Sequence, residues 1–166
     1  KHFSREGINH LILFTDGRTY GDEDECIRIA DSCGSKGITI HGVAIGNDFS
    51  DRLLDDLASR TGGSVAFLDS PQAIMGVMEG IFEALGRTVA SRLRLEGAVA
   101  PQVDLRSSFR LLPEPMPMGD SLPMNLGNLP RDGVVRVLLE LVIHPIGKMT
   151  ELTLAHFTID GDILGK

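Results

Sequence analysis

Two patterns of apolar and polar residues divide the chain near residue 90. Before that point, short apolar runs without polar alternation each precede a segment in which apolar residues recur at three- and four-residue spacing. The runs are typical of strands covered on both faces, and the spaced segments are typical of amphipathic helices. The apolar runs occupy residues 11–14, 38–45 and 64–68. Three strand–helix repeats in succession predict a parallel, right-handed α/β sheet.

Residues that favour helix starts and ends bound each helical segment. The expected boundary residues are Asp22 with Glu25 in a capping box and Gly37 for the first helix, Ser50 and Gly62–Gly63 for the second, and Pro71 at the first position of the third. The predicted buried faces are Cys26, Ile29, Ala30 and Cys33; Leu53, Leu54, Leu57 and Ala58; and Ile74, Met78, Ile81, Leu85 and Val89.

From Ser91 onward, apolar and polar residues alternate. Period-two alternation with one polar face predicts antiparallel strands that are half exposed. The predicted strands cover residues 91–96, 103–111, 134–144 and 152–159, and the polar face of the second contains Asp104, Arg106 and Arg110. The proline-rich segment from Pro113 to Pro130 is interpreted as a long connection. The predicted fold class is therefore α/β: a partial doubly wound parallel sheet in residues 1–90, followed by an antiparallel β-sandwich segment in residues 91–166.

Composition and charge narrow the classes of partner. The 166 residues are 42% hydrophobic and 23% charged, with a formal net charge of −7. A negative chain lacks the basic face that nucleic acids or anionic membranes require. No segment reaches the ~20 apolar residues of a spanning helix, and residues 1–6 do not form a signal-peptide core. Cys26 and Cys33 are too far apart on a helix to form a disulfide, so we expect free buried thiols and a cytoplasmic protein.

Polar residues follow all three predicted parallel strands. These residues are Thr15 and Asp16, Asn47 and Asp48, and Asp69 and Ser70. In open α/β sheets, ligands bind at the carboxyl ends of the strands, and oxygen ligands of this kind suit Mg²⁺, Mn²⁺ or Ca²⁺. Asp48, Asp69 and Ser70 also fit ordinary turn and cap roles. Asp16 is the strongest metal-ligand candidate, because it lies six residues before the acidic run that starts the first helix.

Three motifs together resemble the second half of a von Willebrand factor type A domain. They are Leu-Ile-Leu-Phe-Thr-Asp-Gly at 11–17, Ile-Thr-Ile-His-Gly-Val-Ala-Ile-Gly at 38–46, and Leu-Leu-Asp-Asp-Leu-Ala-Ser-Arg-Thr-Gly-Gly-Ser at 53–64. The resemblance covers residues 8–84. It implies a metal-ion-dependent adhesion site whose ligands come from an Asp-x-Ser-x-Ser motif, a threonine, and the aspartate of Thr-Asp-Gly. Asp16 is the counterpart of that aspartate. The β-rich remainder resembles the sandwich that follows such domains in some bacterial proteins.

The resemblance also implies how the chain differs from a whole domain. The Asp-x-Ser-x-Ser motif and the threonine have no counterpart here, so we expect the chain to be part of a larger protein and to bind a divalent metal weakly or not at all by itself. In the parent protein, Mg²⁺ (or Mn²⁺ or Ca²⁺) would accept an acidic residue from a protein partner. The strand at 11–14 would lack its family neighbour. We therefore expect an open apolar edge that self-associates, or that a segment such as residues 1–9 covers.

Three functional alternatives remain open. The first is a non-catalytic, metal-dependent binding or assembly module. The second is a purely structural scaffold without a metal site. The third is a receiver-like or hydrolytic domain that uses Asp16, although the sequence contains no Walker loop, nucleophile elbow or His-Glu-x-x-His motif. His41, inside an apolar strand, is interpreted as a hydrogen-bonded core residue. Met116, Met118 and Met124 are interpreted as gap-filling residues of a proline-rich connection rather than as a contact surface.

Overall fold

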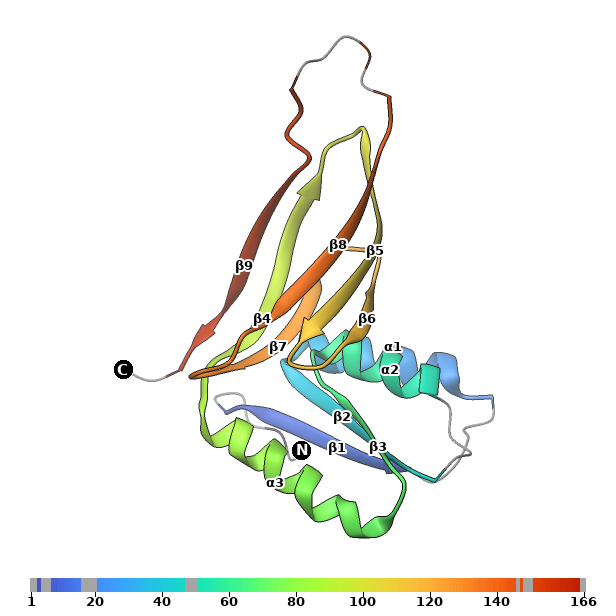
Figure 1. Cartoon of the computed structure of the whole chain (residues 1–166), viewed down its shortest axis with the longest axis vertical. Coiled ribbons are helices and arrows are strands. Elements are labelled where there is room, and N and C mark those ends of the chain that lie inside the picture. Colours follow the sequence, from blue (N-terminus) through green and yellow to red (C-terminus); the bar gives the residue numbers. More distant parts are fainter. Residues whose placement is uncertain are drawn as a thin grey trace.

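The computed structural model describes residue 3 and residues 7–15, 21–46, 51–145, 147 and 151–164, with only the backbone at residues 51 and 71. The molecule consists of an α/β layer at one end and a long, twisted pair of β-sheets that rises from it (Figure 1). This is the predicted class: a three-stranded parallel sheet with helices, followed by two antiparallel three-stranded sheets.

The parallel sheet contains β1 (Asn9–Thr15), β2 (Ile38–Ile45) and β3 (Val65–Leu68) in the order β1-β2-β3. All three predicted strands are confirmed. The prediction that each is covered on both faces holds for β2. It is wrong for the two edge strands, because Leu11, Leu13 and Phe14 of β1 and Phe67 of β3 are exposed. The difference in exposure follows from the order of the strands. β2 lies in the centre of the sheet, whereas β1 pairs with β2 alone among the described strands.

Helices α1 (Glu23–Ser35) and α2 (Asp51–Thr61) pack together on one side of the sheet (Figure 1). The predicted buried face of α2 is confirmed, since Leu53, Leu54, Leu57 and Ala58 are all buried. The predicted face of α1 is partly wrong. Ile29 is 52% exposed, and Ile27 packs instead against the cluster around Ala30.

The helix ends agree in position with the sequence signals but not always in mechanism. Gly37 and Gly62 have positive φ angles just after α1 and α2, as predicted. Asp22 precedes the first residue of α1, yet its side chain makes no capping bond. Glu23 Oε2 accepts the Gly21 N–H instead, and Glu25 pairs with Arg28 rather than closing a capping box. The predicted cap Ser50 lies outside the described residues.

The third helical segment is shorter than predicted and loosely packed. Pro71 begins a 3₁₀ turn, η1 (Pro71–Ala73), and α3 (Ile74–Gly86) follows on the side of the sheet opposite α1 and α2 (Figure 1). Val89 belongs to the next strand rather than to the helix. No residue of α3 is buried, so its predicted apolar face is not enclosed by the described part of the chain.

The antiparallel part contains β4 (Thr88–Val99), β5 (Val103–Leu112), β8 (Arg136–Ile143) and β9 (Ala155–Ile163), which confirm the four predicted strands. The interpretation of 113–130 as a connection is wrong, because it contains β6 (Met116–Gly119) and β7 (Met124–Pro130). The sheets have the orders β7-β4-β9 and β6-β5-β8.

The two antiparallel sheets enclose a second core. Leu95, Met124 and Leu126 form its buried cluster. Met116 is also buried, and Met118 packs against the cluster. The methionines fill packing space, as predicted, but they belong to the strands β6 and β7 and not to a connection.

Both cysteines are free and partly buried in α1, which agrees with the expected thiols. Among the described residues, no helix combines the length and apolar character needed to cross a membrane.

Candidate functional site

The carboxyl ends of the parallel strands meet at one edge of the sheet. Thr15 ends β1 beside Ala44, and Ile45 ends β2 beside Leu68 of β3. Gly46 N–H donates to Leu68 O and ties the ends of β2 and β3 together. This edge is where sequence reasoning placed a cation.

The strongest metal candidate, Asp16, is the next residue after β1 in the sequence, and it lies outside the described residues, as do Asn47 and Asp48. Asp69 is exposed after β3, and Ser70 O accepts the Ala73 N–H that begins η1. Ser70 therefore has the turn role expected for it. Across the described ranges, no three His, Cys, Asp or Glu side chains lie close enough together to hold a metal ion.

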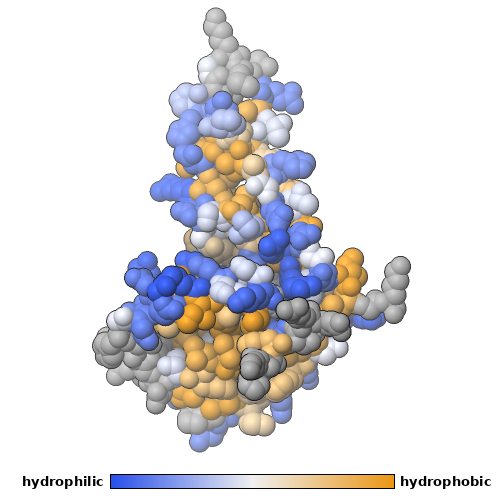
Figure 2. All heavy atoms as spheres, turned by 180° about the vertical axis from the view of Figure 1, so that it is seen from behind, coloured by the Kyte–Doolittle hydropathy of each residue, from blue (hydrophilic) through white to orange (hydrophobic). Residues whose placement is uncertain are grey.

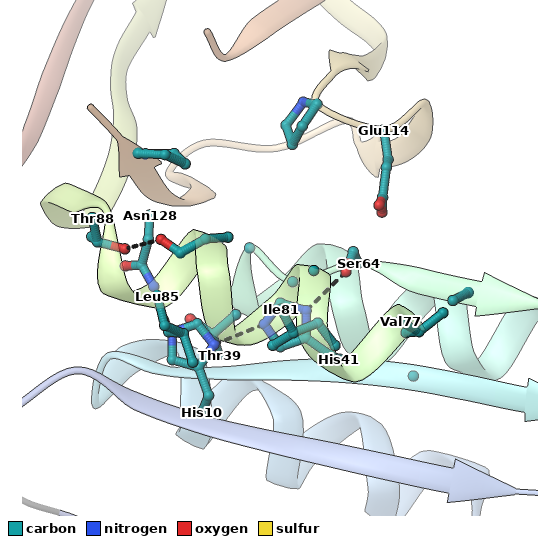
Figure 3. A pocket seen from close by; sticks show the side chains of 18 of the residues that line it. His10, Thr39, His41, Ser64, Val77, Ile81, Leu85, Thr88, Glu114 and Asn128 are labelled. Carbon is teal, nitrogen blue, oxygen red and sulfur yellow. Dashed lines mark hydrogen bonds between the residues drawn. The ribbon is translucent and has the colours of Figure 1, made fainter. Parts of the chain in front are cut away.

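A row of four polar side chains crosses the sheet face beneath α3 (Figure 3). Asn128 of β7 donates from Nδ2 to His10 Nε2 over 2.7 Å. His10 Nδ1 lies 2.7 Å from His41 Nε2, and His41 Nδ1 lies 2.8 Å from Ser64 Oγ. The two imidazole rings are stacked with centroids 5.0 Å apart. The row thus links β1 and β2 to the residue before β3, and also to β7 of the antiparallel part.

Burial keeps both histidines neutral near pH 7. It lowers the pKa of His10 to about 4. It also lowers the pKa of His41 to about 4, and the positive charges of His10 and Arg110 act in the same direction. A neutral imidazole has one donor and one acceptor nitrogen. If each Nδ1 carries the proton, every bond in the row has one donor and one acceptor.

The row forms part of the lining of a cavity of about 390 Å³ between the sheet and α3. Apolar residues of α3, including Val77, Ile81 and Leu85, form the opposite wall (Figure 3). Imidazoles with pKa values near 4 are weak bases, so the row is better suited to holding strands together than to accepting protons at neutral pH.

Arg110 of β5 also lines this cavity and is only 3% exposed. Its guanidinium donates to the carbonyl oxygens of Gly62, Gly63 and Glu114. Gly62 and Gly63 follow α2, so the cation lies at the negative end of the helix dipole. Burial lowers the Arg110 pKa, and the charge of Glu114 opposes that shift. The alternation pattern placed Arg110 on a solvent-facing side, which is wrong.

Sequence reasoning identified His41 as a hydrogen-bonded core residue; its hydrogen bonds are confirmed, but the side chain is only partly buried and lines the cavity. It did not single out His10, Ser64, Asn128 or the burial of Arg110. No local signal was available for them, since Asn128 is 118 positions from His10.

The N-terminal half of the chain resembles a known domain family in sequence. Residues 2–79 match the sequence profile of the von Willebrand factor type A (vWA) domain. This segment belongs to the vWA family. The parallel sheet with helices on both sides is thus a vWA segment, and antiparallel sheets follow it.

Solved structures share this arrangement. A von Willebrand factor type A protein from Catenulispora acidiphila matches 98% of this chain with a TM-score of 0.74 and 17% identity, over 40% of its own length. The human COPII-coat protein Sec24c matches 80% of the chain with a TM-score of 0.50 and 15% identity, over 21% of its length. At these identities the likeness shows the fold alone.

Among curated proteins, the uncharacterized protein sll0103 of Synechocystis sp. is 23% identical over 145 residues. The match covers 82% of this chain and 34% of the relative. The vWA segment and its β-sheets therefore correspond to about a third of that relative.

Proposed function

We propose that this chain is part of a non-catalytic protein-binding or assembly module that works through a divalent cation at the carboxyl edge of the parallel sheet. Asp16 contributes one ligand to Mg²⁺, or to Mn²⁺ or Ca²⁺ in its place. A protein partner supplies an acidic side chain to the same cation. The remaining ligands come from residues outside this chain.

One observation carries the proposal. β1 of a parallel sheet leads directly into Thr15-Asp16-Gly17, within a segment that belongs to the vWA family. A carboxylate at a strand end is a suitable ligand for a hard cation. In a chain of net charge −7, a cation with an open coordination position is also a means of attracting an acidic partner.

His10 and His41 have pKa values of about 4, so the proposal gives this partly buried pair no proton-accepting role at neutral pH. We also propose a cytoplasmic location, which the free thiols of Cys26 and Cys33 support.

A structural scaffold without a metal site is the second candidate. The observation that favours it is the close junction between α2 and the antiparallel sheets. Arg110 caps the end of α2, and Asn125 Nδ2 donates to Arg60 O. A structural scaffold that holds two parts of a protein in a fixed arrangement needs a rigid junction of this kind.

Calorimetric titration separates the two candidates. Mn²⁺ and Mg²⁺ are titrated into the longest form of the protein that its gene encodes, as wild type and as Asp16→Ala. The matched control is Asp24→Ala, an exposed acid in the first turn of α1. We expect stoichiometric binding that Asp16→Ala abolishes and Asp24→Ala preserves. Absence of binding, or equal binding by all three proteins, would favour the scaffold.

A further inference from the structure

The cavity between the parallel sheet and α3 has an apolar wall and a polar wall. Its volume of about 390 Å³ lies within the range of small-molecule sites. The apolar wall includes Val77, Ile81 and Leu85 of α3 (Figure 3). The polar wall includes Ser64, at the end of the hydrogen-bonded row, and Arg110 of β5. The unused hydrogen-bonding groups of the polar wall indicate which head group fits it.

The row of polar side chains ends in a donor. Arg92 N–H donates to Asn128 Oδ1, so Asn128 Nδ2 is the donor to His10 Nε2. Each neutral imidazole then donates from Nδ1, and His41 Nδ1 donates to Ser64 Oγ. The hydroxyl hydrogen of Ser64 has no acceptor among the described residues. It is left to donate to a ligand.

Arg110 is a buried cation without a carboxylate partner in the described part of the chain. It is 3% exposed, and its guanidinium donates to three backbone carbonyl oxygens, one from each nitrogen. A guanidinium has five N–H donors, so one N–H on each terminal nitrogen is unused. None of the ion pairs between described residues includes Arg110. A carboxylate that accepts from either unused N–H would supply the counter-charge.

Both donors lie at the same end of the cavity. Arg110 donates to Gly63 O, and Gly63 immediately precedes Ser64 in the chain. The charge of Arg110 also acts on His41, whose Nδ1 donates to Ser64 Oγ. A single acceptor group is therefore the natural partner of both residues.

Apolar side chains also gather on the outer surface of the α/β end, bounded by a hydrophilic band at the junction with the β-sheets (Figure 2). An apolar surface alone does not specify an occupant. The cavity differs from that surface, because its buried cation and its unused donors specify the chemistry of a ligand.

We propose that the cavity binds a small amphipathic monocarboxylate with an unbranched alkyl chain. The carboxylate accepts hydrogen bonds from the Ser64 hydroxyl and from Arg110. The alkyl chain lies against the apolar wall of α3, where its removal from water contributes to binding.

Glu114 opposes this binding. It lines the cavity, is exposed, and acts electrostatically on Arg110, since its charge opposes the fall in the Arg110 pKa that burial causes. A ligand carboxylate is repelled by Glu114, and the solvent around an exposed side chain screens that repulsion. Neutralising Glu114 should therefore strengthen the binding of an anion.

The first test is an NMR titration of the 166-residue chain at pH 7 with three probes that share one alkyl chain and differ in head group: octanoate, octan-1-ol and octylamine. We expect saturable binding of octanoate with shift changes centred on Ser64, Val77 and Ile81. We expect weaker binding of octan-1-ol and none of octylamine. No saturable binding of octanoate, or octylamine binding as tight as octanoate, would overturn the proposal.

Variants test the location and the charge. Val77→Phe enlarges a side chain of the apolar wall, and Met75→Phe is the matched control at a 66% exposed residue of the same helix. We expect Val77→Phe to abolish octanoate binding and Met75→Phe to preserve it. Octanoate affinity should rise several-fold in Glu114→Gln and be lost in Arg110→Met.

Circular dichroism shows whether each variant is folded. If Arg110→Met does not fold, Glu114→Gln and the octylamine titration still test the charge. Octanoate binding that Val77→Phe leaves unchanged would overturn the location, and an affinity that Glu114→Gln leaves unchanged or lowers would overturn the recognition of the carboxylate.

Discussion

At the residue scale, Arg110 is a buried cation whose guanidinium donates to three backbone carbonyl oxygens. Its side chain comes from β5, and two of its acceptors follow α2, so this residue is one of those that link the two parts of the molecule. Removing one partner of a buried hydrogen bond costs more than the bond itself contributes, because the other partner stays desolvated. Arg110 is therefore a sensitive probe of the junction.

Arg110→Met should lower the free energy of unfolding by about 2–4 kcal/mol, because the Gly62 and Gly63 carbonyls lose a charged donor. Arg106→Met on the same strand is the control. Arg106 is exposed and faces Glu140 across 3.5 Å, so its loss should change stability by less than about 0.5 kcal/mol. Urea unfolding measures the free energy of unfolding of both variants. If both variants lose the same amount, the buried contacts of Arg110 are not stabilising.

The histidine pair predicts how stability depends on pH. The folded-state pKa values of His10 and His41 are about 4, below the ordinary value of 6.5. Above pH 6.5 both histidines are neutral in the folded and in the unfolded state, so their full contribution to the free energy of unfolding is present. As the pH falls from 6.5 towards 4, only the unfolded chain takes up these protons, so stability should fall by about 1 kcal/mol per pH unit for each histidine.

Urea unfolding at pH 7.5, 6 and 5 checks this slope. The double variant His10→Asn, His41→Gln should have a flatter profile, and His156→Gln, at an exposed residue, should keep the wild-type slope. Stability of the wild type that stays constant from pH 7.5 to 5 would contradict the account.

At the element scale, the end of α2 and β7 approach each other closely. Gly62 and Gly127 both have positive φ angles, and a Cβ built at Gly127 would lie 2.1 Å from Gly62 O. No side chain fits at that distance. The two glycines thus set how closely the vWA segment packs against the antiparallel sheets.

Gly127→Ala tests this contact, and Gly119→Ala separates backbone strain from collision. Gly119 also has a positive φ but has nothing within 4 Å of its Cβ position, so alanine there should cost about 1–2 kcal/mol. Gly127→Ala should cost about 1–3 kcal/mol more, because the backbone of β7 must move. Thermal or urea unfolding would reveal the difference, and equal costs would rule out a tight junction.

The sequence predicted those elements whose periodicity is long and regular. α2 has four buried residues at helical spacing, and β5 and β8 alternate over eight residues or more. It missed β6 and β7, because β6 has four residues and both strands contain proline. It also missed the partly buried polar row, because hydrogen bonds between distant residues leave no periodic pattern in the sequence.

At the scale of the whole molecule, a vWA segment and two antiparallel sheets are joined by polar contacts from Arg110, which is buried, and from Asn125 and Asn128.

The central claim is that a cation binds at the carboxyl edge through Asp16. Mn²⁺ is paramagnetic and broadens NMR signals of nearby residues, so substoichiometric Mn²⁺ locates the site in the longest form of the protein that its gene encodes. We predict broadening centred on Thr15, Gly46 and Asp69, and its loss in Asp16→Ala. Broadening centred on the acidic start of α1 at Glu23–Glu25, or no localised broadening, would contradict the claim.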